Sequence, residues 1–177
     1  MPLPISASVA APFDTRHFRH ALAQFATGVT VITTATGDGG FLGLTATSFN
    51  SVSLQPPLVL WSLGTGSSSL AMFSASTHYV INVLGADQAA LATRFATKVQ
   101  ERFDGVGHDL SATGQPILHG AVAWFECSNR SRYPEGDHVI FVGEVARCEF
   151  TPRAPLIFHG GAFVSTTPPL PPVATDQ

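Results

Sequence analysis

Residues 43–69 read Gly-Leu-Thr-Ala-Thr-Ser-Phe-Asn-Ser-Val-Ser-Leu-Gln-Pro-Pro-Leu-Val-Leu-Trp-Ser-Leu-Gly-Thr-Gly-Ser-Ser-Ser. The pattern predicts a strand, a polar turn, a buried apolar strand and a serine-rich helix start. Hydroxyl groups gather in its turns, yet the stretch carries no charged side chain. Backbone groups and hydroxyls can hold a flat polar ligand, but they supply no acid, base or metal ligand. The stretch therefore favours a site that leaves the chemistry to a cofactor.

The length and composition describe one domain with little surface charge. The chain has 177 residues, of which 45% are hydrophobic and only 12% are charged, about half the usual charged share. The low charge indicates that part of the surface is covered, most simply by a second copy of the chain. The alternative is a small, uncharged surface rich in serine and threonine.

The charge and the distribution of apolar residues argue against a nucleic-acid-binding, a membrane-spanning or a secreted protein. The net charge is −3 and Lys98 is the only lysine, so a phosphate-tracking surface for nucleic acid is not expected. No apolar run approaches the roughly 18 residues of a membrane span. Residues 1–13 lack the basic start and sustained apolar core of a secretory signal, so a cytoplasmic protein is expected.

The cysteines and histidines show no metal-ligand spacing. Cys127 and Cys148 lie in strand-like runs, and we expect both to be buried as small apolar residues. His17 and His20 stand three apart on a predicted helix without further ligands nearby, so no metal site is expected.

The remaining pattern predicts three short helices among strands. Asp14 caps a helix with an apolar face of Phe18, Ala21, Leu22 and Phe25, and Gly28 ends it. Ser67 or Ser68 caps a second helix through Phe73, and Asp87 caps a third to about Thr97. Strands are expected at 29–34, 41–47, 58–63, 79–84, 121–129, 139–150 and 156–158, with loops at 104–120 and 130–137.

Strands joined mostly as hairpins predict a mainly β fold, a closed antiparallel barrel with helical additions. We expect a loose N-terminal arm at 1–13, one domain at 14–166, and an extended Pro-rich tail at 167–177.

The order and spacing of several motifs resemble the short-chain flavin reductases, a family of FMN-binding split β-barrels. The resemblance runs from about Phe18 to Phe163. It is carried by Ala26-Thr27-Gly28-Val29-Thr30-Val31-Ile32-Thr33-Thr34, Gly43 to Ser53, Pro56-Pro57-Leu58, Ser67-Ser68-Ser69, Val80-Ile81-Asn82-Val83-Leu84, Arg94-Phe95-Ala96, Gly136-Asp137-His138 and Val142-Gly143-Glu144-Val145.

This resemblance implies a Greek-key split barrel, a homodimer, and reduction of FMN or FAD by NADH or NADPH. It also implies a partner monooxygenase that receives the reduced flavin. The implied flavin contacts are Thr45, Ala46, Thr47 and Ser48 with Ser51 at the ring, Trp61, Ser62 and Leu63 along the ring or ribityl chain, and Ser67, Ser68 and Ser69 at the phosphate. His138 is implied to meet the nicotinamide nucleotide.

The chemistry suits these residue types. Hydride passes directly from nicotinamide to flavin, so no catalytic acid or base is expected. Backbone N–H groups on the small residues 45–48 can favour negative charge on the reduced ring. An ordinary strand end with Ser/Thr turns is the alternative. Ser67–Ser69 offers hydroxyls and a helix start to a phosphate, or it is a plain helix cap.

Five further residues keep two interpretations each. Arg94 either provides a cation for the phosphate or is a solvated helix residue. Asn82 either meets the ligand or satisfies neighbouring backbone, and Trp61 either stacks near the ring or narrows the pocket. His138 contacts the nicotinamide or is an exposed surface group, and His159 borders the flavin or is structural.

Three functions therefore compete. The first is an NAD(P)H:flavin oxidoreductase that supplies a monooxygenase. The second is a flavin-binding carrier or sensor without turnover. The third is a small barrel for an apolar ligand, which would not need the uncharged, hydroxyl-rich stretch.

Overall fold

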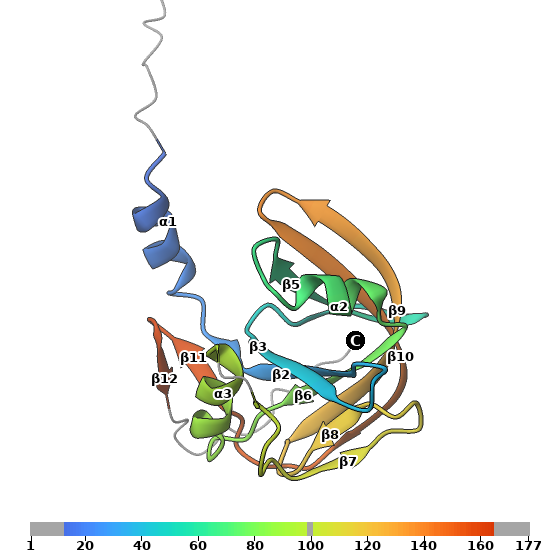
Figure 1. The fold of residues 1–177 in the computed structure, drawn as a ribbon. Coiled ribbons are helices and arrows are strands. Elements are labelled where there is room, and N and C mark those ends of the chain that lie inside the picture. The colour runs from blue at the N-terminus through green and yellow to red at the C-terminus, as the bar shows by residue number, and fades with distance from the viewer. Residues whose placement is uncertain (1–12, 99–100, 165–177) are drawn as a thin grey trace, which may run out of the picture.

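A seven-stranded sheet curls into a barrel and forms the centre of the structure (Figure 1). The computed structural model describes residues 13–98 and 101–164. The sheet order is β3-β2-β6-β9-β10-β5-β4, and every neighbouring pair is antiparallel. Its strands are β2 (Thr30–Ala35), β3 (Phe41–Ala46), β4 (Asn50–Leu54), β5 (Pro57–Gly64), β6 (His78–Val83), β9 (Ala123–Glu135) and β10 (His138–Phe150). The predicted mainly β, antiparallel barrel is confirmed.

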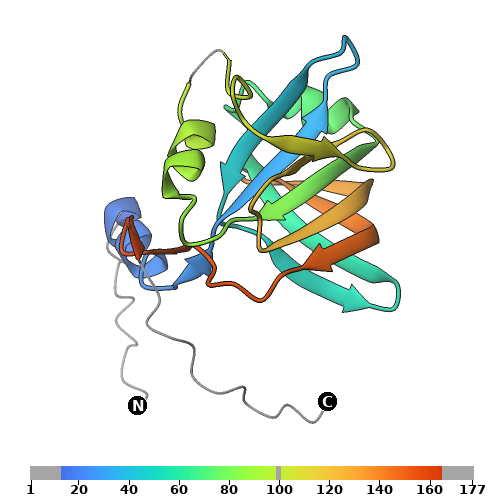
Figure 2. The same cartoon turned by 90° about the horizontal axis from the view of Figure 1, so that it is seen from below.

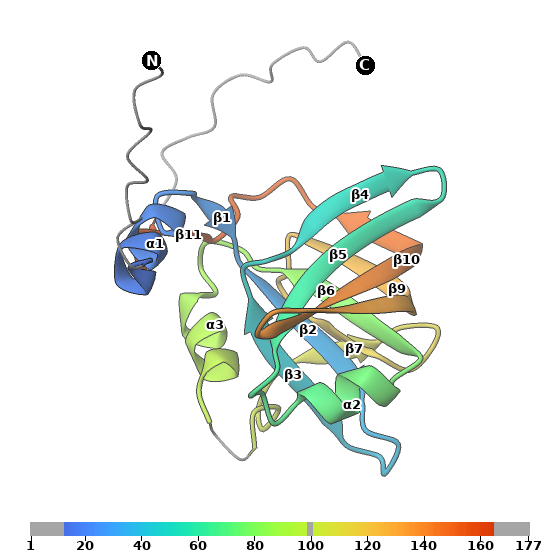
Figure 3. The same ribbon diagram turned by 90° about the horizontal axis from the view of Figure 1, so that it is seen from above.

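The barrel is split and not closed by a continuous ladder. Strands β3 and β4 are the two edges of the sheet and do not pair with each other. Strand β3 instead comes against β5, and the loop between β3 and β4 crosses the gap (Figure 3). The expectation of a closed barrel was wrong in this respect, because residues 47–49 leave the ladder between β3 and β4.

Three helices and two small sheets surround the barrel in the described residues. The helices are α1 (Thr15–Leu22), α2 (Leu70–Ala75) and α3 (Ala89–Ala96). Strands β1 (Thr27–Gly28), β11 (Ile157–His159) and β12 (Ala162–Val164) form a small sheet beside α1 (Figure 2). Strands β7 (His108–Leu110) and β8 (Pro116–Leu118) form a hairpin.

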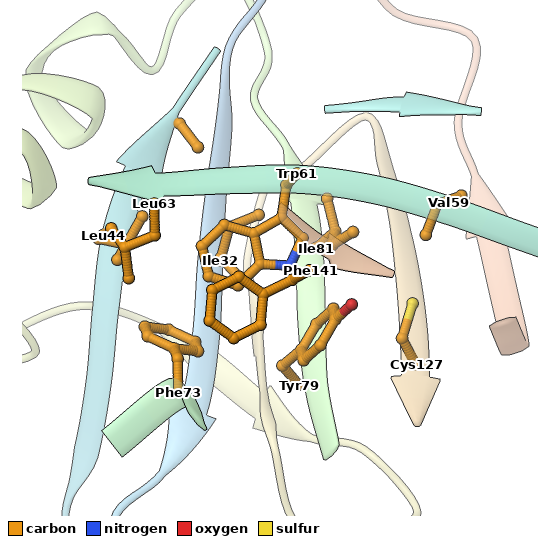
Figure 4. Close-up of a cluster of buried hydrophobic side chains, with 11 residues drawn as sticks. Ile32, Leu44, Val59, Trp61, Leu63, Phe73, Tyr79, Ile81, Cys127 and Phe141 are labelled. Atoms are coloured by element: carbon orange, nitrogen blue, oxygen red, sulfur yellow. The ribbon is translucent and has the colours of Figure 1, made fainter. Parts of the chain in front are cut away.

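Strand β2 lies between two apolar cores, since residues 30–34 are all buried. Inside the barrel, Ile32 joins an aromatic cluster around Trp61, Phe141, Tyr79 and Phe73 (Figure 4). The Trp61 and Phe141 rings stack with centroids 4.5 Å apart and planes 12° from parallel. On the other face of β2, a second core packs Val29 and Val31 against α3, β8 and the chain before β11; its members are Val29, Val31, Leu84, Ala92, Phe95, Leu118 and Leu156.

The predicted N-terminal helix is present, but its apolar face is not packed. The Asp14 carboxylate accepts from the N–H groups of Arg16 and His17, as its capping position predicts. The helix ends at Leu22, before Gly28, and none of its residues is buried. Phe18 and Leu22 remain about half exposed, so the helix stands away from the barrel (Figure 1).

Several strands differ from the prediction. Strand β5 alternates between buried and half-buried residues, so burial on both faces was wrong. Strand β4 replaces part of the expected turn, β7 and β8 lie in the expected 104–120 loop, and β12 is a strand for which no prediction was made. Strands β9 and β10 extend into the expected 130–137 loop and leave only Gly136 and Asp137 as the turn, because polar hairpin arms do not show apolar alternation. The expected tail at 167–177 and nearly all of the 1–13 arm lie outside the described residues.

The two cysteines have different environments. Cys127 is buried in the barrel, and this desolvation, with the nearby carboxylate of Glu126, raises its pKa to about 12. Cys148 is exposed near the end of β10, so its predicted burial was wrong.

A buried carboxylate holds the β7–β8 hairpin against β9. Glu126 is 1% exposed and accepts from the N–H and the hydroxyl of Thr113 at 2.9 and 2.7 Å. Burial alone would raise its pKa, but hydrogen bonds from Ser111 and Thr113 and the charge of Arg147 outweigh it. The pKa of Glu126 is therefore lowered.

We predict that Glu126→Gln lowers the free energy of unfolding at neutral pH by about 1–3 kcal/mol, because charged hydrogen bonds are lost. A lowered folded-state pKa stabilises the fold above the unfolded pKa, and this stabilisation is lost as the pH falls through the folded value. The variant should therefore lose less stability than the wild type below the ordinary glutamate pKa of 4.5. Urea unfolding at neutral and acidic pH measures this, with exposed Glu149→Gln as the control. Equal acid sensitivity of all three proteins would contradict the role.

Candidate functional site

Side-chain hydrogen bonds fix the segment Gly43–Ser48 from several neighbouring elements. The Thr30 hydroxyl donates to the Ala46 carbonyl at 2.8 Å, and the Thr45 hydroxyl donates to the Ala92 carbonyl of α3 at 2.7 Å. The Ser48 hydroxyl accepts from the N–H of Ser62 at 2.9 Å and contacts its carbonyl at 3.2 Å. The segment is thus fixed before any ligand binds, which lowers the entropic cost of binding.

Beyond β3 the same segment leaves backbone donors free. Thr47 and Ser48 are exposed and lie outside the strands. Their N–H groups, and that of Phe49, donate to no acceptor among the described residues. Unpaired N–H groups beside small uncharged side chains fit the carbonyl oxygens and ring nitrogens of a flavin. The residues present therefore suit that group.

His138 lies against the end of β5, close to this surface. Strand pairing sets His138 opposite Gly64, and a Cβ built on Gly64 would lie 3.8 Å from the imidazole Nε2. The N–H and the hydroxyl of Thr65 donate to the Asp137 carbonyl at 2.9 and 3.1 Å. The β9–β10 turn and the β5–α2 turn therefore form one connected unit.

A carboxylate orients the His138 ring. The imidazole Nδ1 lies 2.7 Å from Asp137 Oδ1, and both side chains are exposed. The hydrogen bond from His138 and the charge of that ring lower the pKa of Asp137, with a smaller contribution from Arg19 on α1. With Nδ1 bound to the carboxylate, Nε2 is directed away and is free to meet a ligand.

The serine cluster fits the prediction only in part. Ser67 is half-buried and Ser68 is exposed, but Ser69 is 4% exposed and its hydroxyl does not cap the helix. The predicted cap at Ser67 or Ser68 was wrong, because Ser69 is the N-cap and the Ser67 hydroxyl accepts from its N–H. A phosphate could reach Ser67 and Ser68 but not the Ser69 side chain.

Two predicted flavin contacts in β5 have their side chains in the core. Trp61 is fully buried between Phe141, Phe73 and Tyr79, and Leu63 is 8% exposed in the same cluster (Figure 4). Alternation along β5 turns both inward, so stacking of the indole on a ligand was wrong. Ser62 lies between them on the other face and contacts Ser48.

Asn82 is a structural residue and not a ligand contact. It is fully buried, its amide donates to the Val31 carbonyl and the Thr33 hydroxyl at 3.1 Å, and its oxygen accepts from Leu118 N–H at 2.9 Å. All these groups belong to β2 and β8, so the second of the two interpretations holds.

Arg94 and Arg102 both bond to backbone near the end of α3. Arg94 Nη2 donates to the carbonyls of Glu101 and Asp104 at 3.0 and 2.6 Å, so its guanidinium holds this loop, and its phosphate contact stays a prediction. Arg102 Nη1 donates to the Gly43 carbonyl at 2.8 Å. Arg102 was not among the predicted site residues, because no spacing rule connects residues 59 positions apart.

The structure separates two other predicted residues from this surface. Ser51 is exposed on β4 and lines a groove at the open end of the barrel. His159 lies half-buried in the small sheet beside α1, and no hydrogen bond joins it to Thr45–Ser48 among the residues described.

Metal-ligand clusters and membrane-spanning helices are absent from the part of the chain that the structure describes. Within the described ranges, no three His, Cys, Asp or Glu residues gather to hold a metal ion. No described helix has the length and apolar character to cross a membrane.

Comparison with known proteins identifies the family of the chain. Residues 22–167 match the model of the flavin reductase like domain. The chain is 47% identical over 150 residues to FMN reductase (NADH) SmoA of Agrobacterium fabrum, covering 85% of each chain. It is 37% identical to HsaB, the reductase subunit of a flavin-dependent monooxygenase of Rhodococcus jostii, covering 92% of this chain and 83% of HsaB. The chain is also 42% identical over 137 residues to a longer protein of Rhizobium meliloti, named a probable flavin reductase. The match covers 77% of this chain and 44% of that protein.

Among solved structures, the NADH:FAD oxidoreductase SgcE6 of Streptomyces globisporus, in complex with NAD and FAD fragments, is similar with a TM-score of 0.84. It is 38% identical, and the match covers 92% of this chain and 98% of that one. The sequence motifs, the split barrel and these matches lead to one conclusion: the chain belongs to the flavin reductase like family.

Proposed function

We propose that this protein is an NADH-dependent flavin reductase that reduces FMN or FAD and supplies the reduced flavin to a partner monooxygenase. One observation carries the proposal. Thr47, Ser48 and Phe49 have free N–H groups, and the Ser48 hydroxyl bonds this segment to Ser62 on β5. Strand β5 ends at Gly64, next to the His138 imidazole.

The flavin ring would lie against Thr45–Ser48. The backbone N–H groups of Thr47 and Ser48 would donate to the pyrimidine side of the ring, and the small side chains allow close approach. Ser67 and Ser68 would donate hydroxyl hydrogen bonds to the phosphate. The buried side chains of Trp61, Leu63 and Asn82 would support the site from the core without touching the flavin.

The nicotinamide nucleotide would meet His138. The His138 imidazole is exposed, and its orientation is fixed by Asp137. The imidazole Nε2 lies over Gly64, which has no side chain to block the approach from that direction.

The chain's own residues have a limited chemical task. Flavin and nicotinamide nucleotide, when bound, would supply the redox chemistry of hydride transfer, and this chain's residues would bind and orient them. Preorganised N–H donors at 47–49 favour negative charge on the acceptor without a formal positive charge in contact with it. The absence of charged residues from 43–69 is compatible with this task, because no residue has to give or take a proton.

The relatives support the finer parts of the proposal. SmoA is named for NADH and FMN, and HsaB is a subunit of a flavin-dependent monooxygenase. We therefore propose NADH as the donor and an oxygenase as the acceptor of reduced flavin. We also propose a cytoplasmic location, where this donor is regenerated.

We further propose a homodimer that covers the open end of the barrel. A groove of about 490 Å³ runs there between β4, β5, β9 and β10, and no charged residue lines it. Apolar side chains lie exposed on or beside its lining: Leu54, which lines the groove, is 89% exposed, and Phe150, two residues after the groove-lining Cys148, is 79% exposed. A stable interface needs about 800 Å² per partner, and an aromatic side chain such as Phe150 can bury roughly 150–250 Å² of that area. A second copy is the occupant that the low overall charge favours.

A steady-state assay tests the activity. The purified protein is mixed with FMN or FAD, and oxidation of NADH or NADPH is followed in air. We expect flavin-dependent oxidation with NADH. Flavin binding without turnover would identify a carrier or sensor, and no flavin binding would refute both functions.

We predict that His138→Ala raises the apparent KM for NADH more than that for flavin, because the imidazole meets only the nicotinamide nucleotide. His119→Ala is the matched control, since His119 forms another exposed pair, with Asp109 at 3.3 Å. Equal changes in both KM values would contradict this assignment.

We predict that Leu54→Glu converts the dimer to monomers, because a carboxylate would enter an uncharged interface. Its side chain is nearly fully exposed, so the fold of one copy should not suffer. Sedimentation velocity measures the change, and Leu110→Glu on β7, also exposed, is the control. A monomeric wild type, or a Leu54→Glu variant that stays dimeric, would exclude this interface.

A further inference from the structure

We infer that Arg102 is the positioning residue for the flavin-contacting segment: its guanidinium holds the start of Gly43–Ser48 against the end of α3. The inference rests on the proposed flavin site. It assigns a role in that site to a residue that does not itself touch the ring.

The guanidinium joins two elements at once. Nη1 donates to the Gly43 carbonyl at 2.8 Å, and Nε donates to the Thr97 carbonyl at 3.0 Å. Thr97 is the C-cap of α3. A planar guanidinium presents these two donors in a fixed fork, whereas a lysine ammonium on a flexible stem does not reproduce it.

The location of Gly43 makes this bond important. Strand β3 is an edge of the seven-stranded sheet, so one side of it is not paired with another strand by a hydrogen-bond ladder. Thr30, Thr45 and Ser48 anchor the later part of the segment. Arg102 is the described side chain that bonds the carbonyl at its start.

Aromatic packing beside Arg102 fixes the same point. A Cβ built on Gly43 would lie 2.5 Å from Phe95 Cε1 and 3.3 Å from Phe103 Cε2. The two rings meet edge to face, with centroids 5.1 Å apart. Phe103 follows Arg102 directly, so one short loop supplies both a ring against the strand and a hydrogen bond to it.

Arg94 supports the loop that carries Arg102. It donates to the carbonyls of Glu101 and Asp104, on either side of Arg102 and Phe103. Arg94 therefore holds the loop that carries Arg102, and Arg102 in turn holds strand β3. A change at Arg102 would loosen Gly43 first and then the donors at Thr47 and Ser48.

The test compares the wild type with Arg102→Met and Arg102→Lys. We expect both variants to weaken FMN binding, measured by fluorescence titration, by about ten- to a hundred-fold, the cost of losing a charged hydrogen bond. The KM for NADH should change much less. Lysine keeps the charge but not the fork, so an Arg102→Lys variant with wild-type affinity would overturn a positioning role.

A second measurement does not depend on flavin. Hydrogen exchange of the amides at 43–48, in ligand-free protein, should be faster in both variants than in the wild type. Unchanged exchange would overturn the inference, even if the wild type failed to bind FMN and the proposed function fell for that separate reason. Arg153→Met is the matched control, because Arg153 also joins a carbonyl, of Gly120 at 3.3 Å, to a second group, Asp87 at 2.9 Å. It should affect thermal stability without changing FMN affinity or exchange at 43–48.

Discussion

The site depends on the stacked pair of Trp61 and Phe141 inside the barrel. These residues lie directly opposite each other on β5 and β10, and both are fully buried. Each ring stabilises the fold by about 1.5–3 kcal/mol through burial, and their stacking adds about 0.5–1.5 kcal/mol. A slip of one residue between the two strands would turn the ring on the shifted strand outward, so this pair fixes the strand register. Three residues further along, the same register sets His138 opposite Gly64. The core thereby aligns two parts of the candidate site that it does not touch.

Short-range sequence patterns predicted the features that depend on residues close together in the chain. The Asp14 cap, the β2–β3 hairpin and the barrel class follow from short-range signals, and ordered motifs indicated the family. Burial within the site was harder to predict. The run Leu58–Leu63 is almost entirely apolar, so it hides the alternation that turns Trp61 inward. The partners of Asn82 and the Gly43 partner of Arg102 lie 36 to 59 residues away, and only the folded topology brings these groups together.

The candidate site is an uncharged surface with charges set around it. Residues 43–69 contain no ionisable acid or base. Arg102 bonds the backbone from one side, and the Asp137–His138 pair lies at the end of β5. Such an arrangement suits the proposed reductase, in which a flavin and a nicotinamide nucleotide would each be held and then released. Neutral hydrogen bonds give orientation without the large desolvation cost of buried ion pairs.

The bond between Thr65 and the Asp137 carbonyl couples the lengths of two turns. An inserted residue in either turn would move His138 off Gly64, although each turn alone is exposed and could accept it. The β2–β3 turn at 37–39 has no such link to the site: its hydrogen bonds stay within residues 36–40. Descendants of this sequence are thus free to vary in length at one end of the barrel, while at the other end any change of length must occur in two places together.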